Sequence, residues 1–191
     1  MNKRNRVYII AEIGPNHNGS LKLAEKMVRL LKNSGADAVK FQLGAPEEVY
    51  SQDAFMAEYQ KKNTNFKSIQ EMSKKNQLSH ESHLKLKKLC KMCNLEYMCS
   101  AFDLKSLEFL IKKIKISTIK IPSGEITSLD ILKYISKLKK RVILSTGMAT
   151  FQDIKNAITE INKHFKKKIT LLHCISNYPA APEKLNLNVI K

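Results

Sequence analysis

The chain has 191 residues, of which 43% are hydrophobic, so it can bury one sizeable core and does not have the composition of a disordered chain. Its formal net charge of +17 at pH 7 favours an anionic substrate or partner. The charge comes from lysines spread along the sequence, with only four arginines, and there is no Trp. Nucleic-acid binding uses arginine forks and stacking aromatics, so we expect solvated lysine-rich helix faces and no nucleic-acid partner.

No stretch of the sequence has the features of a targeting or membrane segment. The first apolar run is VYII, at residues 7–10, and no run approaches the roughly eighteen apolar residues of a membrane span. We therefore expect a cytoplasmic protein without a membrane partner.

Short β-branched runs alternate with longer amphipathic segments along the chain. The predicted strands cover residues 7–13, 36–43, 95–100, 116–121, 142–145 and 169–175. The predicted helices cover residues 21–35, 79–94, 104–113, 128–140 and 150–165. Such alternation is typical of parallel βαβ units, and we predict an α/β fold of the (β/α)8 TIM-barrel type. A doubly wound sheet stays open as the alternative, although no G-x-G-x-x-G follows any of the runs.

The stretch AEIGPNHNG, residues 11–19, places Glu12, Asn16, His17 and Asn18 where the first strand ends. Similar polar residues follow the other predicted strands: Lys40 and Gln42, Ser100 and Asp103, Lys120 and Ser123, Ser145 and Thr146, His173 and Ser176. In a (β/α)8 barrel the active site lies at the carboxyl ends of the strands. We therefore predict that these side chains form one site.

Two lysines and two glycine-containing turns indicate what that site binds. Lys40 in AVKFQ and Lys120 in TIKIPSGE have apolar neighbours, and a lysine is costly to bury unless an anion pairs with it. The turns IPSGE and LSTGM offer small residues, hydroxyls and a following helix to an anion, although each alone could be a simple helix cap. Together they predict a site for a carboxylate, a phosphate or both.

The remaining titratable groups are predicted to be structural. Cys90-x-x-Cys93 has no second pair to complete a metal site, and its helical spacing with Leu86 predicts buried small side chains. His80, His83 and His164 lie in lysine-rich helical segments, so we expect them at the surface. We therefore predict no metal ligands within this chain.

The long segment 44–79 and the number of βα units depart from a regular barrel. The segment is much longer than a usual βα loop, and we expect it to fold over the pocket. The sequence contains six predicted strands, whereas a closed barrel needs eight and about 250 residues. We therefore expect residues 1–191 to form one incomplete barrel, truncated after about six βα units, with its first and sixth strands as open edges.

Five stretches of the sequence are similar to the N-terminal barrel of the sialic acid synthases, which make nine-carbon 2-keto acids. They are AEIGPNHNGSLKLAEKMVRLLKNSGADAVKFQ, SAFD, IKIPSGEITSLDILKYI, VILSTGMATFQDI and LLHCISNYPA. The resemblance implies a metal-dependent transferase that condenses phosphoenolpyruvate with an N-acetylmannosamine-type aldehyde. In that family carbon 3 of phosphoenolpyruvate attacks the aldehyde, water adds at carbon 2, and phosphate leaves.

The resemblance also implies roles for individual residues. Lys40 and Ser100 would hold the carboxylate of phosphoenolpyruvate, Lys120 would bridge carboxylate and phosphate, and the phosphate would contact Ser123, Ser145 and Ser176. Glu12, Lys120 and Glu125 would be the catalytic residues, with Glu125 orienting the sugar or a metal-bound water. Asn16 and His17 would line the pocket and bind the sugar.

Parts of the family pattern are missing from this sequence. The family's usual STPFD reads CSAFD here, with Ala101 in place of the proline, so the edge of the site is expected to be less rigid. The family's metal-binding histidines and its small C-terminal antifreeze-like domain, which reaches across a homodimer, lie beyond the resembling region. The resemblance therefore implies Mn²⁺ or Mg²⁺ and a homodimer for a complete enzyme, and little or no activity for these 191 residues alone.

The substrate and two other classes of function stay open at this point. The segment 44–79 fits synthases of legionaminate-type sugars about as well as those of N-acetylneuraminate, with a slight preference for the former. Another phosphoenolpyruvate-aldehyde synthase, of the octulosonate or heptulosonate phosphate type, is one alternative. A non-catalytic basic remnant that binds anions or nucleic acid is the other.

Overall fold

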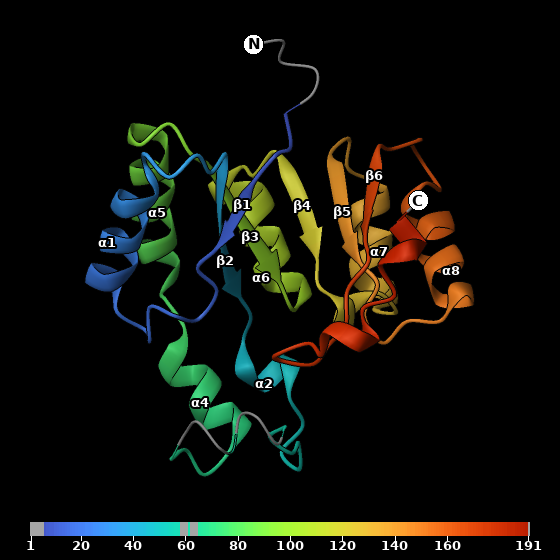
Figure 1. The fold of residues 1–191 in the computed structure, drawn as a ribbon, viewed down its shortest axis with the longest axis horizontal. Coiled ribbons are helices and arrows are strands. Elements are labelled where there is room, and N and C mark those ends of the chain that lie inside the picture. Colours follow the sequence, from blue (N-terminus) through green and yellow to red (C-terminus); the bar gives the residue numbers. More distant parts are fainter. Residues whose placement is uncertain (1–5, 58–60, 62–64, 191) are drawn as a thin grey trace.

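A computed structural model describes residues 6–57, 61 and 65–190 of the chain. Six parallel strands form one curled sheet in the order β1-β2-β3-β4-β5-β6 (Figure 1). They are β1 Ile10–Glu12, β2 Ala38–Leu43, β3 Glu96–Ala101, β4 Thr118–Ile121, β5 Arg141–Ser145 and β6 Ile169–Leu172. All six predicted strands are confirmed, and β1 and β6 are shorter than their apolar runs.

Helices connect the strands as the hydrophobic spacing predicts. They are α1 Leu21–Leu31, α2 Pro46–Val49, α4 Ile69–Asn76, α5 His80–Met92, α6 Leu104–Phe109, α7 Leu129–Ser136 and α8 Phe151–Ile161. Side-chain caps fix where several of them begin. Ser79 accepts a hydrogen bond from the Ser82 amide at the start of α5, and Thr150 and Asp153 form a capping box at the start of α8.

The helices cover one face of the sheet and leave the other face without a helical layer. Val39, Phe41 and Leu43 of β2 belong to the core with the inward side chains of the helices, while the alternate residues Lys40 and Gln42 lie on the opposite face. Because a doubly wound sheet carries helices on both faces, this arrangement contradicts that alternative (Figure 1). The chain is a curled, open half-barrel of parallel βα units.

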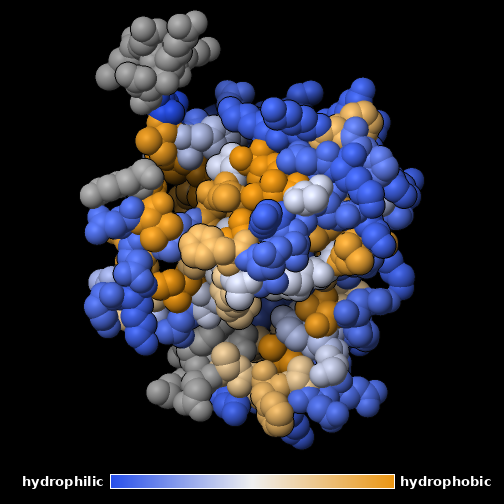
Figure 2. Space-filling model, turned by 90° about the vertical axis from the view of Figure 1, so that its right-hand side faces the viewer, coloured by the Kyte–Doolittle hydropathy of each residue, from blue (hydrophilic) through white to orange (hydrophobic). Residues whose placement is uncertain are grey.

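The two ends of the sheet are open within the described residues. β1 pairs with β2 alone and β6 pairs with β5 alone, as the predicted count of strands required. Exposed apolar side chains lie near both edges, among them Tyr8 and Ile9 beside β1 and Leu171 and Leu172 in β6. Figure 2 views the β6 side and shows apolar side chains gathered among hydrophilic ones.

The expectation that His83 is a surface residue is wrong. His83 is completely buried, its Nδ1 atom lies 2.7 Å from the Tyr97 hydroxyl, and its ring packs edge-on against Phe41. The many lysines of α5 suggested a solvent-exposed helix. One face of α5 is nevertheless buried, and His83 lies on this face, three residues before Leu86 and seven before Cys90. His80 and His164 are exposed, as expected, and Cys90 and Cys93 are buried.

The segment 44–79 lies beyond the carboxyl ends of the strands (Figure 1). The side-chain amide of Gln70 in α4 donates to the carbonyl of Tyr50, which ties the two ends of the segment together. Its placement over a pocket stays a prediction, because part of it falls on residues 58–60 and 62–64, outside the described residues. Within the described part of the chain, no helix has both the length and the apolar character needed to cross a membrane.

Candidate functional site

A row of polar side chains crosses the helix-free face of the sheet at the carboxyl ends of its strands. The strand register places Glu12 beside Lys40, Gln42 beside Ser100, and Ser100 beside Lys120. Ser145 follows on β5 and receives a hydrogen bond from Lys120. The predicted convergence of these side chains is therefore present in the structure.

Glu12 is held by two side chains of the neighbouring strand. Lys40 forms an ion pair with Glu12 Oε2, and the Gln42 amide donates to Glu12 Oε1 over 3.1 Å. Lys40 also donates to the Ser100 hydroxyl over 3.2 Å. Gly14 closes this arrangement, because a Cβ there would lie 2.9 Å from Glu12 Oε1.

Lys120 is a buried ammonium with no carboxylate bonded to it in the described residues. Its Nζ donates to the Ser145 hydroxyl over 2.6 Å and to the Ile121 carbonyl over 3.0 Å, and the residue is only 9% exposed. Burial, and then the positive charge of Lys40, lower its pKa to about 8. A bound anion would stabilise this charged form.

A cluster of small polar groups continues the row between β4 and β6. Ser123 accepts a hydrogen bond from the Gly147 amide over 3.0 Å, and its Oγ lies 3.6 Å from Cys174 Sγ. Ser176 lies beside the same glycine, since a Cβ at Gly147 would come within 2.5 Å of Ser176 Oγ and 3.0 Å of Ser123 Oγ. Hydroxyls and an amide thus gather around one point that a small anion can approach.

Cys174 was not singled out as a site residue by sequence reasoning. Partial burial raises the pKa of the Cys174 thiol. Hydrogen bonds with Ser123 and with the amides of Thr146 and Gly147 lower this pKa by more than burial raises it, so the net shift is downward. Its position at the end of the last predicted strand, between His173 and Ser176, is the signal that could have found it.

Three other polar residues at the strand ends make local structural contacts. Glu125 accepts a hydrogen bond from Ser128 in the turn Ser123–Glu125, and burial raises the pKa of its carboxyl. Asp103 caps α6 and accepts the Ala45 amide over 2.8 Å. His173 Nε2 donates to the Leu185 carbonyl over 2.7 Å.

The two predicted sugar-binding residues take different positions. Asn16 is exposed, and its amide donates to the Ile13 carbonyl over 2.8 Å. His17 is only 2% exposed, and its ring packs against Phe41, whose side chain faces the helices. The side chain of His17 thus lies on the helix side of the sheet, away from Lys40 and Gln42, and its contact with a sugar stays a prediction.

The described residues do not fit the divalent cation that the resemblance implies. No group of three His, Cys, Asp or Glu side chains that could hold a metal ion occurs in the described ranges. We therefore assign the cation no ligands and derive no step through it.

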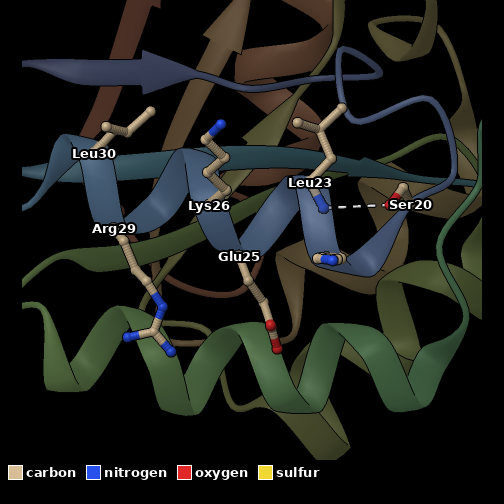
Figure 3. Close-up of a pocket in the computed structure, with 7 residues that line it drawn as sticks. Ser20, Leu23, Glu25, Lys26, Arg29 and Leu30 are labelled. Atoms are coloured by element: carbon tan, nitrogen blue, oxygen red, sulfur yellow. Dashed lines mark hydrogen bonds between the residues drawn. The ribbon is translucent and has the colours of Figure 1, made fainter.

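A surface groove along α1 is separate from this site. It has a volume of about 620 Å³ and runs along α1, where Glu25 and Arg29 point towards α5 and Leu23 and Leu30 point to the other side (Figure 3). It contains none of the residues at the strand ends. The candidate site is thus defined by converging side chains and not by a deep cavity.

Parallel βα units with a row of lysine and hydroxyl side chains at the carboxyl ends of the strands are typical of one class of protein, the barrel-type α/β enzymes. Within this class the chain belongs to the NeuB family, which it matches over residues 27–191.

Several curated relatives are sugar-acid synthases, two of them N,N'-diacetyllegionaminic acid synthases. The chain is 42% identical over 189 residues to N,N'-diacetyllegionaminic acid synthase of Campylobacter jejuni, covering 97% of this chain and 56% of that protein. It is 41% identical to the synthase of the same name from Legionella pneumophila, covering 96% of this chain and 53% of that protein. The chain thus spans about half the length of the curated relatives it matches.

Solved structures agree with the family and the fold. The N-acetylneuraminic acid synthetase of Leptospira borgpetersenii, in complex with citrate, superposes with a TM-score of 0.85 at 31% identity and covers 97% of this chain and 60% of that one. A phospho-2-dehydro-3-deoxyheptonate aldolase of Thermotoga maritima superposes with a TM-score of 0.63 at 13% identity, covering 95% of this chain and 48% of that one. The second likeness shows the fold alone.

Proposed function

We propose that this chain carries the phosphoenolpyruvate site of a nonulosonate synthase, which condenses phosphoenolpyruvate with an N-acetylated hexosamine-type aldehyde and releases phosphate. The observation that carries the proposal is the pair Lys40 and Lys120 on one face of the sheet, with Ser100 between them and Ser145 on the other side of Lys120. Phosphoenolpyruvate bears a carboxylate and a phosphate close together, and two ammonium groups flanked by hydroxyls match that charge pattern.

The proposed roles follow the row across the sheet. Lys40 and Ser100 bind the carboxylate, and Lys120 bridges the carboxylate and the phosphate. The hydroxyls of Ser123, Ser145 and Ser176 bind the phosphate, and the absence of a side chain at Gly147 lets the Ser123 and Ser176 hydroxyls come close together. The Lys120 ammonium and these hydroxyl donors stabilise the negative charge that builds up on the phosphate as the carbon–oxygen bond breaks.

Glu12 is proposed to act where the two substrates meet. Carbon 3 of phosphoenolpyruvate attacks the aldehyde carbon, water adds at carbon 2, and phosphate leaves by cleavage of its bond to that carbon. The ion pair with Lys40 and the hydrogen bond from Gln42 hold the Glu12 carboxylate in place to accept a proton from the water. Glu125, a carboxyl whose pKa is raised by burial, and Asn16 complete the proposed sugar side.

The complete protein is proposed to be a (β/α)8 barrel with two further βα units, a bound divalent cation and a homodimeric partner. The present chain would form the corresponding incomplete barrel domain. We expect them to bind phosphoenolpyruvate but to turn it over slowly or not at all, because the described residues offer no cluster of metal ligands. The expected location is the cytoplasm.

The proposed aldehyde is of the diacetylated legionaminate type. Identities of 42% and 41% to two N,N'-diacetyllegionaminic acid synthases support it over N-acetylmannosamine, since the relative named N-acetylneuraminate-9-phosphate synthase in Drosophila melanogaster is 34% identical. Pocket shape decides between such sugars.

A coupled assay tests the proposal. The chain is incubated with phosphoenolpyruvate, Mn²⁺ and one of three aldehydes: diacetylated, N-acetylated or phosphorylated. Release of phosphate and formation of a 2-keto acid are followed, with the Lys120→Met variant as the blank. Product from an N-acetylated sugar, however slow, supports the proposal. Turnover with the phosphorylated sugar alone would assign the site to the octulosonate or heptulosonate type, and salt-sensitive binding of DNA without any binding of phosphoenolpyruvate would favour a basic remnant.

A further inference from the structure

The turn after β1 has an unusual backbone, and the side chains of Asn16 and His17 form hydrogen bonds with it. Gly14, Asn18 and Gly19 have φ angles of 50°, 49° and 74°, in the left-handed region. Backbone hydrogen bonds from Asn16 to Ile13 and from Ser20 to His17 close the turn at 3.0 and 2.8 Å. Two further hydrogen bonds involve side chains. The side-chain amide of Asn16 donates to the Ile13 carbonyl over 2.8 Å, and the Gly19 amide donates to Nδ1 of the buried His17 ring over 3.1 Å.

The His17 ring is built into the core beneath the turn. Its centroid lies 6.3 Å from that of Phe41, which in turn stacks on Tyr97 at 5.5 Å. Burial lowers the pKa of His17, so the imidazole is neutral near pH 7 and its Nδ1 atom is free to accept the amide hydrogen. The proton of the neutral ring then lies on Nε2.

We infer that His17 is a positioning residue, which anchors the turn 13–20 to the core and thereby places Glu12 and Lys40. This role rests on the proposed function of those two residues.

The turn is coupled to the site through the backbone of Lys40. The amides of Ile13 and Gly14 both donate to the Lys40 carbonyl, over 2.9 and 3.1 Å. Gly14 also lies close to two side chains of the site. A Cβ at this position would come within 2.9 Å of Glu12 Oε1 and 3.3 Å of the Gln42 amide nitrogen. A change in the path of the turn therefore moves both members of the Glu12–Lys40 ion pair.

The other side of the turn touches the segment beyond the strand ends. A Cβ at Gly19 would lie 2.2 Å from the carbonyl oxygen of Lys75 in α4. The turn is thus confined between the core, where His17 holds it, and α4. His17 lies at the point where the segment 44–79 and the sheet meet.

Two substitutions separate anchoring from packing. Asn accepts the amide of the second residue after it in an Asx turn, so His17→Asn keeps the hydrogen bond to Gly19. His17→Leu keeps the apolar packing against Phe41 and has no acceptor. His164→Leu, on the exposed surface after α8, is the matched control.

Amide hydrogen exchange of residues 13–20 and the affinity for phosphoenolpyruvate are measured for all four proteins. We expect His17→Leu to speed exchange in the turn at least about tenfold and to weaken phosphoenolpyruvate binding by about threefold to tenfold, from loss of one hydrogen bond to a neutral acceptor. His17→Asn restores most of both, and His164→Leu changes neither.

Normal exchange and affinity in His17→Leu would overturn the inference, as would a His17→Asn protein as defective as His17→Leu. If the wild-type chain does not bind phosphoenolpyruvate, the proposed function fails, but the exchange measurement still decides the anchoring role. If His17→Leu does not fold, His17→Asn alone decides it, since slow exchange in the turn of that variant requires the restored acceptor.

Discussion

Lys120 combines burial with a titration close to neutral pH. Its pKa is lowered to about 8, so above that pH the free protein must take up a proton before it binds a dianionic phosphate. We predict that the affinity for phosphoenolpyruvate falls by up to about tenfold per pH unit above pH 8. Calorimetric titrations between pH 7 and 10 measure this slope.

The Lys120→Arg variant is the control for this titration. Arginine stays charged throughout that pH range, so any binding that it retains is expected to be independent of pH. Equal slopes in the two proteins would show that another group is responsible.

His83 makes the fold sensitive to acid. Burial, and then the nearby His17 and His80, lower its pKa to about 4, and its Nε2 atom has no hydrogen-bond partner among the described residues. Because the folded state disfavours the charged ring, its contribution to stability is complete above about pH 6.5 and is lost as the pH falls towards 4. We predict a loss on the order of 2–3 kcal/mol over this range, measured by urea unfolding at each pH.

The double variant His83→Phe/Tyr97→Phe tests the assignment to this ring. It removes the titrating group together with the hydroxyl that binds it, so no buried polar partner is left unpaired. Its stability is expected to change less between pH 7 and 4 than that of the wild type. An unchanged acid dependence would assign the effect to other groups.

The lysines and histidines of this chain differ in how far their surroundings could be predicted from the sequence. Lys40 and Lys120 were identifiable because a lysine inside a β-branched run is costly unless a partner is present. The burial of His83 was not predicted because the four lysines around it suggested a solvated helix, and that of His17 was not predicted because its neighbours in NHNG are polar. In both cases the burial depends on Phe41, which is distant in sequence and gives no local signal.

At the scale of elements, the two turns that follow β4 and β5 contact each other through Ser123 and Gly147, and we propose that together they bind the phosphate. The Gly147→Ala variant would push its Cβ to within 2.5 Å of Ser176 Oγ and 3.0 Å of Ser123 Oγ. Both contacts are ends of side chains that can rotate away, so we predict a folded protein whose phosphoenolpyruvate affinity falls about tenfold, the cost of displacing one or two hydrogen bonds. Binding is measured by calorimetry and folding by circular dichroism.

Gly124→Ala is the matched control, because a Cβ at Gly124 meets nothing within 4 Å. It lies in the same Ser123–Glu125 turn and is expected to bind as the wild type does. Normal binding by Gly147→Ala would mean that phosphate does not occupy the space beside that glycine.

Most elements were predictable because their periodicity was strong. The six apolar runs and the five amphipathic segments give the βα order without any long-range information. The exceptions depend on backbone detail. The helix predicted over 104–113 changes to a π-helical turn at Leu110–Ile114 before Lys115, whose φ angle is 57°, and α4 has too weak an apolar stripe to be recognised within its long segment.

At the scale of the whole molecule, the open edges dominate the expected dynamics. β1 and β6 each pair on one side, while β2 to β5 pair on both sides. We predict that amides of β1 and β6 exchange with solvent at least about a hundredfold faster than those of β3 and β4, because edges open locally at lower free energy. Hydrogen exchange followed by mass spectrometry measures the difference. Equal protection would show that another polypeptide or a second copy covers these edges.

The family assignment and the positive net charge are both consistent with an anionic substrate. The predicted order of motifs matches the NeuB family over residues 27–191, and the surplus of lysines supplies a positive field around a site for an anion. The number of strands was predictable from the sequence. The structure was needed to decide whether helices cover one face of the sheet, as in a barrel, or both faces, as in a doubly wound sheet.

The central claim is that Lys40 and Lys120, with their neighbouring hydroxyls, form a phosphoenolpyruvate site. Isothermal titration calorimetry of the 191-residue chain with phosphoenolpyruvate tests it most directly, with Lys120→Met and the exposed Lys133→Met as a matched pair. We predict one site per chain in the wild type and in Lys133→Met, and at least about a hundredfold weaker binding in Lys120→Met, from loss of a buried charge-assisted hydrogen bond. Absence of binding by the wild type, or unchanged binding by a folded Lys120→Met protein, would contradict the claim.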